Sequence, residues 1–276
     1  MADDVHVAVP RGIDVTKPNV ARVYDYFIGG KDHFAVDRMA AEQALKIIPD
    51  AREAGRACRA FLRRAVRYLA ADVGISQFLD IGSGLPTDTN VHQVAYDVNP
   101  AARVVYVDND PMVLVHGRAL LANSPNTAVI EADIRSPVEI IEHPVVRARL
   151  DFTRPVGLLL LSILHHVHDT EDPGGIAATL RNALPSGSHL AIIHFWDPGE
   201  EHPHISVKVR EAERVFNETL GTGRWRSRAE IEAYFGDFEL LEPGLVPVAE
   251  WRPDAEPAPE KNVSYYTMLG GMARKP

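Results

Sequence analysis

The chain has 276 residues, 46% hydrophobic and 24% charged, which is ordinary for a globular protein large enough to bury a substantial core. Its formal net charge of −9 argues against sequence-independent binding to nucleic-acid phosphates, which requires a basic face. The single cysteine excludes an intrachain disulfide, and no apolar run is long enough to cross a bilayer, so we expect a cytoplasmic protein without membrane or nucleic-acid partners.

The first part of the chain is predicted to be helical. Residues 1–15 show no periodicity and are expected to form a flexible arm. Beyond them, apolar residues recur at helical spacing in three stretches, and Thr16 and Pro18 are expected to begin the first. The predicted helices cover residues 16–28, 35–48 and 51–71. We expect residues 16–72 to form an N-terminal helical cap.

Four of the arginines in the third predicted helix form a basic stretch. They are Arg59, Arg63, Arg64 and Arg67. Basic side chains at such spacing usually form a solvated helix face and not a binding patch. We therefore expect these four side chains to point into solvent.

From residue 73 the pattern changes to short apolar strands that alternate with helices. Strands are predicted at 77–81, 103–107, 127–130, 156–162, 190–194, 238–241 and 263–269. Helices are predicted at 90–96, 111–122, 137–150, 173–183, 205–219 and 228–235. This alternation favours right-handed β-α-β units. We predict an α/β, Rossmann-like, doubly wound core over residues 73–276, with a mostly parallel seven-stranded sheet and the helical cap before it.

The first candidate for ligand binding is the turn after the first strand, residues 80–84. Its glycines permit a tight turn and let backbone N–H groups approach a ligand, although an ordinary strand-to-helix turn explains them equally well. Thr87 stands where a pyrophosphate-binding loop would have its third glycine. The Asp80 carboxylate would repel phosphate but would suit the ammonium group of an amino-acid tail. The turn therefore favours S-adenosylmethionine over NAD.

Two further acids follow the next two strands. Asp108 ends the second strand roughly 20 residues beyond the glycines, where a carboxylate can accept both ribose hydroxyls. Capping of the following helix is the alternative for Asp108, a task that Asp110 could also perform. Asp133 follows the third strand and can accept from the adenine amino group, or it can act as a simple turn residue.

The order of these segments resembles the motifs of class I S-adenosylmethionine-dependent methyltransferases. The matching segments are residues 78–84, 104–110, 131–135 and 158–167. Residues 13–18, 21–26, 29–34, 82–87 and 251–254 further resemble an actinobacterial family called the S-adenosyl methyltransferases, formerly a domain of unknown function. The resemblance covers nearly the whole chain. Pro86 departs from the general class I pattern, in which many members have a small residue there.

The resemblance implies that S-adenosyl-L-methionine is the cofactor. It implies that the first loop contacts the methionine part of the cofactor, that Asp108 binds the ribose and that Asp133 binds the adenine. The expected cofactor-binding residues are Asp80, Gly82, Ser83, Gly84, Asp108, Asn109, Asp133, Ile134 and Ser162. The resemblance implies no particular methyl acceptor.

Three histidines after the fourth and fifth strands are candidate catalytic residues: His165, His166 and His194. Ligands of open α/β sheets lie outside the carboxyl ends of the strands, and histidine can accept a proton near neutral pH. Packing or capping is the alternative for each ring. The segment 166–169 faintly resembles a hydrolase metal motif, but the ligand set is incomplete and we expect no metal.

The turn between the first two helices supplies candidates for a lid over the acceptor. It does not fit a phosphate-binding loop, because an earlier glycine and a hydroxyl after the lysine are missing. We expect a flexible hinge at Gly29 and Gly30. The lid candidates are Tyr26, Lys31, Asp32, His33 and Phe34.

These observations favour an S-adenosylmethionine-dependent methyltransferase with a small-molecule acceptor. One alternative is a regulatory protein that binds S-adenosylmethionine or S-adenosylhomocysteine without catalysis. Another is a nicotinamide-dependent oxidoreductase, which the Asp80 and Thr87 positions disfavour. Homo-oligomer formation stays open.

Overall fold

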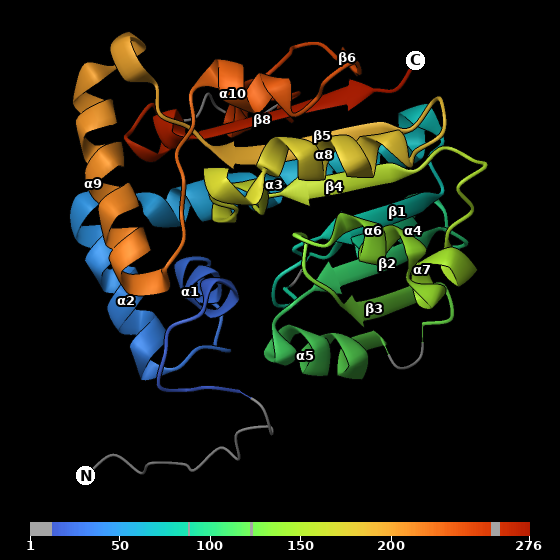
Figure 1. Cartoon of the computed structure of the whole chain (residues 1–276), viewed down its shortest axis with the longest axis horizontal. Coiled ribbons are helices and arrows are strands. Elements are labelled where there is room, and N and C mark those ends of the chain that lie inside the picture. Colours follow the sequence, from blue (N-terminus) through green and yellow to red (C-terminus); the bar gives the residue numbers. More distant parts are fainter. Residues whose placement is uncertain (1–12, 88, 122–123, 255–259) are drawn as a thin grey trace.

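The computed structural model describes residues 13–87, 89–121, 124–254 and 260–276. The arm expected at residues 1–15 therefore lies almost wholly outside the described residues. A mixed sheet crosses the molecule, with helices on both faces and a further group of helices at one end (Figure 1). Within these ranges, no helix combines the length and the apolar content that a membrane crossing needs.

One sheet contains the eight strands of the described residues, in the order β3-β2-β1-β4-β5-β8-β6, with β7 paired to β8. The strands are β1 Gln77–Ile81, β2 Arg103–Asp108, β3 Thr127–Glu131, β4 Gly157–Leu161, β5 His189–Phe195, β6 Glu239–Leu240, β7 Val246–Pro247 and β8 Met268–Arg274. Strands β1 to β5 are parallel, and β8 runs antiparallel to β5, β6 and β7. The reversal of strand order between β1 and β4 confirms the predicted doubly wound, mostly parallel arrangement.

The sheet has one strand more than predicted, and its last strand begins later. The short strand β7 has two residues, too few to show a period in the sequence. Strand β8 begins at Met268 and not at Val263, because residues 264–267 form a 3-10 turn. There the Thr267 hydroxyl donates to the Ser264 carbonyl at 2.9 Å. Such local side-chain bonds compete with strand pairing.

The helices lie close to the predicted ranges. They are α1 Val20–Phe27, α2 Ala35–Ile47, α3 Ala51–Arg67, α4 Val91–Val98, α5 Pro111–Leu121, α6 Pro137–Glu142, α7 Pro144–Arg149, α8 Pro173–Asn182, α9 Pro203–Leu220 and α10 Arg228–Ala233. Helix α1 begins after Asn19 and not at Thr16. The Asn19 side chain accepts from the amides of Ala21 and Arg22 at 2.8 and 3.3 Å, which caps the helix.

Alternate residues of the central strands face two separate cores. Leu79 and Leu158 belong to the core that includes residues of α6, α7, α8 and α10. Phe78 and Leu159 belong to the core that includes residues of α3 and α4. Strand β4 is therefore buried on both faces, which explains its nearly continuous apolar sequence.

Helix α3 packs on the sheet, so its arginines are not the uniform solvated face that was expected. Arg64 is buried, and its Nε donates to the Trp251 carbonyl at 2.8 Å. Arg59 is partly buried, whereas Arg63 and Arg67 are exposed. The prediction was wrong for two of the four side chains, because a helix that covers a sheet turns part of its polar stripe inward.

Helices α1 and α2 pack together and against α9, and these three helices lie across the edge at which the parallel strands end (Figure 1). Val23 and Phe27 of α1 share an apolar cluster with Phe216 of α9. A buried ion pair joins Arg22 Nε to Asp37 Oδ2 at 2.9 Å. We call α1, α2 and α9 the edge helices; the proposed division of the chain at residue 72 stays a prediction.

Candidate functional site

The loop after β1, Gly82–Gly84, is held by hydrogen bonds from its amides to the end of β2. The amides of Gly82 and Ser83 donate to the Val107 carbonyl at 2.8 and 3.2 Å, and the Gly84 amide donates to Asp108 Oδ2 at 2.8 Å. All three N–H groups are thus bonded within the protein, and the predicted contact of this loop with the cofactor stays a prediction. A pyrophosphate group would find no free donor among these three amides, which fits a cofactor without phosphates.

The glycines are nevertheless required by the shape of the loop. Gly82 has a φ of +73°, and a Cβ there would lie 2.6 Å from the side chain of Ile163, in the loop after β4. Gly84 has a φ of +65°, and no described heavy atom lies within 4 Å of the place a Cβ would take. Gly82 therefore packs the two loops together, and Gly84 leaves open backbone surface.

Ser162 directly follows β4, in a conformation that is uncommon for a residue other than glycine. Its φ is +68°, and its amide donates to the Ile193 carbonyl at 3.0 Å. Residues in such strained conformations cluster at ligand sites. The position beside the Gly82 loop agrees with the predicted role of Ser162 in cofactor binding, which stays a prediction.

Asp108 organises the neighbouring backbone at the end of β2. Besides the Gly84 bond, its Oδ1 accepts from the Asp110 amide at 3.0 Å. Burial raises the pKa of Asp108, while bonds from the Asp110 and Gly84 amides lower it. Asp110 Oδ1 accepts from the Met112 amide at 2.6 Å, so Asp110 meets the capping need of α5. Asp108 is thus left for the loop and for a ligand.

Asn109, directly after β2, lies beside Asp133, which follows β3. Asn109 Nδ2 donates to Asp133 Oδ2 at 3.0 Å, and the Arg135 amide donates to Asp133 Oδ1 at 2.9 Å. Burial raises the pKa of Asp133, but hydrogen bonds from Arg135 and Asn109 and the Arg135 charge bring it below its usual value. The Ile134 side chain is buried in the core instead, because its position faces the sheet.

Asp80 is the most perturbed carboxylate at this edge. It is 5% exposed, and burial raises its pKa to about 7; the Arg59 charge lowers the value and the Asp108 charge raises it. A buried carboxylate at the end of β1 is suited to a cationic group of a ligand. The Asp80 carboxylate therefore fits S-adenosylmethionine, whose amino-acid end carries an ammonium group.

A shallow hollow, partly open to solvent, lies beside the loop. It runs between α4 and α5, against β2 and β3. Its lining residues are Ser83, Gly84, Pro86, Asn90, His92, Tyr106, Val113, Gly117, Leu120 and Val129. Pro86 thus shapes the wall of a hollow adjoining the loop.

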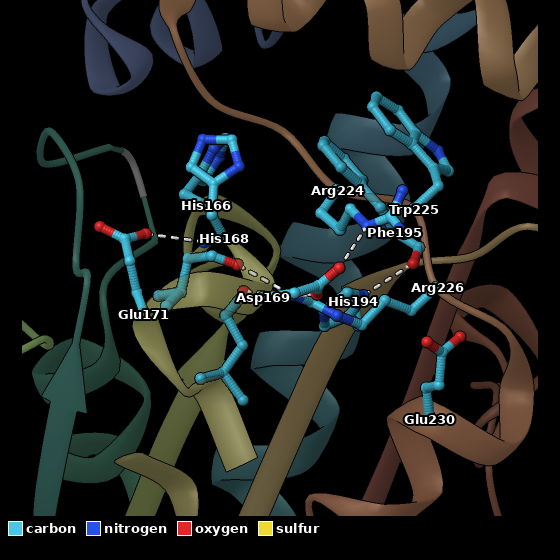
Figure 2. A network of polar contacts seen from close by, with 12 residues as sticks. His166, His168, Asp169, Glu171, His194, Phe195, Arg224, Trp225, Arg226 and Glu230 are labelled. Carbon is cyan, nitrogen blue, oxygen red and sulfur yellow. Dashed lines mark hydrogen bonds and ion pairs between the residues drawn. The ribbon is translucent and has the colours of Figure 1, made fainter. Parts of the chain in front are cut away.

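His194, near the end of β5, is part of a polar network with Arg226 and Asp169 (Figure 2). Its Nδ1 lies 2.7 Å from the Phe195 carbonyl and its Nε2 lies 3.0 Å from Arg226 Nη1. Because arginine only donates, Nε2 accepts and Nδ1 carries the proton. Burial lowers the pKa of His194 to about 3. Both nitrogens are engaged, so the geometry gives His194 the task of holding Arg226.

His165 is also engaged within the protein. It is 1% exposed, and its ring stacks on Phe195 with 3.5 Å between the ring centres. Its Nδ1 accepts from the Phe195 amide at 3.2 Å, and burial lowers its pKa well below the ordinary value. These contacts favour a packing role over a catalytic one.

His166 differs from the other two histidines. Its Nδ1 is buried and has no hydrogen-bond partner among the described residues. Burial lowers its pKa to about 3, and the charge of Arg135 lowers it further. Figure 2 shows the His166 ring pointing away from the contacts between Arg226 and Asp169. Of the three candidates, His166 alone presents an uncommitted buried nitrogen.

The turn between α1 and α2 is fixed and is not the flexible hinge that was expected. Asp25 is 3% exposed; its Oδ2 accepts from the Asp32 amide at 2.9 Å and lies 3.0 Å from His33 Nδ1. The Phe34 amide donates to buried Asp37 at 2.8 Å. Two buried carboxylates therefore hold this turn.

Two of the five lid candidates contact the segments that follow β1 and β2. Phe34 packs against Leu85 and Met112, which follow β1 and β2. Asp32 Oδ2 lies 3.5 Å from His116 Nδ1 of α5. The turn thus connects the edge helices to the loop region.

The other lid candidates do not show such contacts. The Tyr26 hydroxyl donates to Glu42, and its ring lies edge-on to His33, so its polar atom is used among the N-terminal helices. Lys31 is exposed. Among the described residues, no group of three or more His, Cys, Asp or Glu side chains is placed to hold a metal ion.

Sequence reasoning missed three arginines that organise this edge. Arg135 bonds to Asp133, Glu171 and the His166 carbonyl. Arg226 is buried and joins Asp169 to His194 (Figure 2). Arg59 approaches Asp80 from α3. Arg135 lies within a recognised motif and could have been selected; Arg226 and Arg59 lie in none.

The comparison with family models decides the family. Residues 6–276 match the model described as S-adenosyl methyltransferase. The chain belongs to this family. It is therefore an S-adenosylmethionine-dependent methyltransferase, as the resemblance implied.

Two solved structures are similar over nearly their whole length. A crystallised protein from Thermobifida fusca YX, assigned to the methyltransferases, shares 48% identity at a TM-score of 0.91, with 98% of this chain and 99% of that chain covered. A DUF574 family protein from Streptomyces avermitilis MA-4680 shares 41% identity at a TM-score of 0.88, with 95% and 99% covered. A comparison with curated proteins finds no match.

Proposed function

We propose that this methyltransferase acts on a small-molecule acceptor, bound between the carboxyl edge of the sheet and the edge helices. The supporting observation is that these helices contact both sides of that edge. Phe34 packs near the loops after β1 and β2, while residues of α9, including Val209, pack with Trp225 near the end of β5. A methyl-transfer site that is covered by helices in this way suits a small-molecule acceptor and excludes water.

The acidic charge of the chain supports the same acceptor class. A net charge of −9 gives no general attraction for nucleic-acid phosphates. We also propose a cytoplasmic location, because the single cysteine, Cys58, is buried and forms none of the disulfide bonds that are typical of proteins in oxidising compartments.

Four of the predicted cofactor residues have a task that follows from their positions. Asp80 would accept from the ammonium group and Asp108 from the ribose hydroxyls, while Asn109 and Asp133 would meet the adenine. S-adenosylmethionine, when bound, supplies an electrophilic methyl group on a sulfonium. The protein's contribution is to align the acceptor with this group and to keep water away.

The chemistry of His166 narrows the acceptor. An imidazole with a pKa of about 3 is neutral at physiological pH and is a weak base, so it can accept a hydrogen bond but does not hold a proton. We infer an acceptor atom that is nucleophilic without a strong base and that carries a hydrogen for Nδ1 to accept, such as the nitrogen of a neutral amine. His166 would orient that atom through its free Nδ1.

Parallel calorimetric titrations test the cofactor assignment. S-adenosylmethionine and S-adenosylhomocysteine should bind, and NAD should not. A methyl-transfer assay with a panel of small amines, thiols and phenols, beside RNA and protein acceptors, then tests the acceptor class. Transfer to a macromolecule and to no small molecule would overturn the proposal.

A further inference from the structure

The contacts that Arg59 makes with other described residues give it no clear structural role. It lies on α3, in the layer that covers the sheet, and it is partly buried. Its Nε is buried and has no hydrogen-bond partner among the described residues. A buried guanidinium N–H without an acceptor is costly, so its position needs a reason.

The surroundings of Arg59 place it at the methionine end of the cofactor site. Its charge acts on Asp80 at the end of β1, and its guanidinium carbon lies 5.5 Å from the centre of the Tyr24 ring. The Tyr24 hydroxyl donates to the Gly55 carbonyl of α3 at 3.2 Å. Helix α1 thus holds an aromatic face beside Arg59, which orients a guanidinium by a cation–π contact.

Asp80 and Arg59 present opposite charges from neighbouring elements, a strand end and a covering helix. The amino-acid end of S-adenosylmethionine carries an ammonium and a carboxylate on one carbon. An acid alone would attract the ammonium but would repel the carboxylate. A partly buried arginine nearby removes that repulsion and supplies directed donors for a carboxylate.

We propose that Arg59 binds the carboxylate of the cofactor's amino-acid end, while Asp80 binds its ammonium group. The site therefore selects for an intact α-amino acid on the adenosine. This inference rests on cofactor binding at this edge and is independent of the acceptor's identity.

The test compares three ligands by calorimetry: S-adenosylhomocysteine, its decarboxylated analogue S-adenosyl-3-thiopropylamine, and 5′-methylthioadenosine, which lacks both charged groups. The wild-type protein should bind S-adenosylhomocysteine about 10- to 100-fold more tightly than the decarboxylated analogue, since a charged hydrogen-bond partner is lost. This comparison needs no variant, so it is independent of any folding defect.

Variants then assign the preference to Arg59. Arg59→Gln should lose about 10- to 100-fold in affinity for S-adenosylhomocysteine and stay within about twofold for the decarboxylated analogue. Arg59→Lys should recover part of the loss. Arg63→Gln changes an exposed arginine of the same helix and should bind all three ligands like the wild type.

Three outcomes would count against the inference or against the cofactor assignment beneath it, and they can be told apart. Equal losses for both ligands in Arg59→Gln would make Arg59 a structural residue and overturn the inference. Equal wild-type affinity for S-adenosylhomocysteine and its decarboxylated analogue would show that there is no carboxylate site. A wild-type protein that binds none of the three ligands would instead refute the cofactor assignment on which the proposed function rests.

Discussion

Two buried carboxylates, Asp80 and Asp108, stand at the ends of neighbouring strands, and their environments differ. Asp108 accepts two backbone amides, which favour its charged form. No hydrogen bond from a backbone amide contributes to the pKa of Asp80. This pKa is about 7 because burial raises it more than the Arg59 charge lowers it. A ligand cation would therefore change the protonation of Asp80 more than that of Asp108.

We expect the affinity for S-adenosylhomocysteine to rise with pH through the pKa of Asp80. Below about pH 7 the carboxyl holds a proton that must leave before it can pair with the ammonium group, and above that value the affinity levels off. The gain between pH 6 and pH 8 should be about tenfold. Calorimetry in buffers of different ionisation enthalpy would count the released proton. Asp80→Asn should bind weakly with a flat profile; a flat wild-type profile would contradict the expectation.

Asp108→Asn should weaken S-adenosylhomocysteine binding by about 1–3 kcal/mol, because one acceptor for the ribose becomes a donor. Asp97→Asn, an exposed position on α4, is the matched control and should bind normally. Titration of both variants measures the difference. Unchanged affinity in Asp108→Asn would leave Asp108 as a loop-organising residue only.

At the residue scale, the positions of the acids could be predicted better than the surroundings of the histidines. Asp80, Asp108 and Asp133 follow strands whose order can be predicted, so their gathering at one edge follows from the fold. His165 and His194 follow the same rule, yet their rings are used for packing and for holding Arg226. Arg226 comes from a distant segment without a motif, so its contact with His194 could not be predicted.

At the scale of elements, the loop of Gly82–Gly84 and the turn before α2 are both fixed by internal hydrogen bonds. The predicted strands and helices are largely present, because their apolar periods are strong. The exceptions are ends, such as the start of β8 and the start of α1, where side chains bond to nearby backbone. Periodicity does not record such bonds.

Two glycines with similar backbones allow a matched test of the loop. Gly84 and Gly221 have φ values of +65° and +69°, and at neither would a Cβ meet a described atom within 4 Å. Replacement by alanine should cost about 1 kcal/mol of stability at both. Only Gly84→Ala should also weaken S-adenosylhomocysteine binding, because the added methyl group occupies the open loop surface. Equal binding by the two variants would mean that the cofactor does not approach Gly84.

At the scale of the whole molecule, the edge helices are coupled to the loops after β1 and β2. Leu85 and Met112 belong to one apolar cluster, and Phe34 packs against it. The sequence predicted N-terminal helices, but it could not predict that α9 would join α1 and α2, because that contact joins distant parts of the chain.

Binding of S-adenosylhomocysteine should therefore slow amide hydrogen exchange in residues 29–34 as well as in the loop after β1. Phe34→Ala should reduce the protection of residues 29–34 and weaken binding several-fold, since it removes the contact between the two regions. Met39→Ala, at a side chain 65% exposed on α2, is the control and should change neither. Protection confined to the loop would show that the edge helices respond independently.

The Val107 carbonyl, which accepts from both the Gly82 and the Ser83 amide, has a kinetic consequence. A loop whose donors are already bonded keeps its shape before a ligand arrives, so its ordering entropy is lost when the chain folds and not at each encounter. Exchange of S-adenosylhomocysteine for a fresh S-adenosylmethionine would then require no refolding of the loop. The pace of successive turnovers would be set by the passage of ligands past Phe34 and its neighbours.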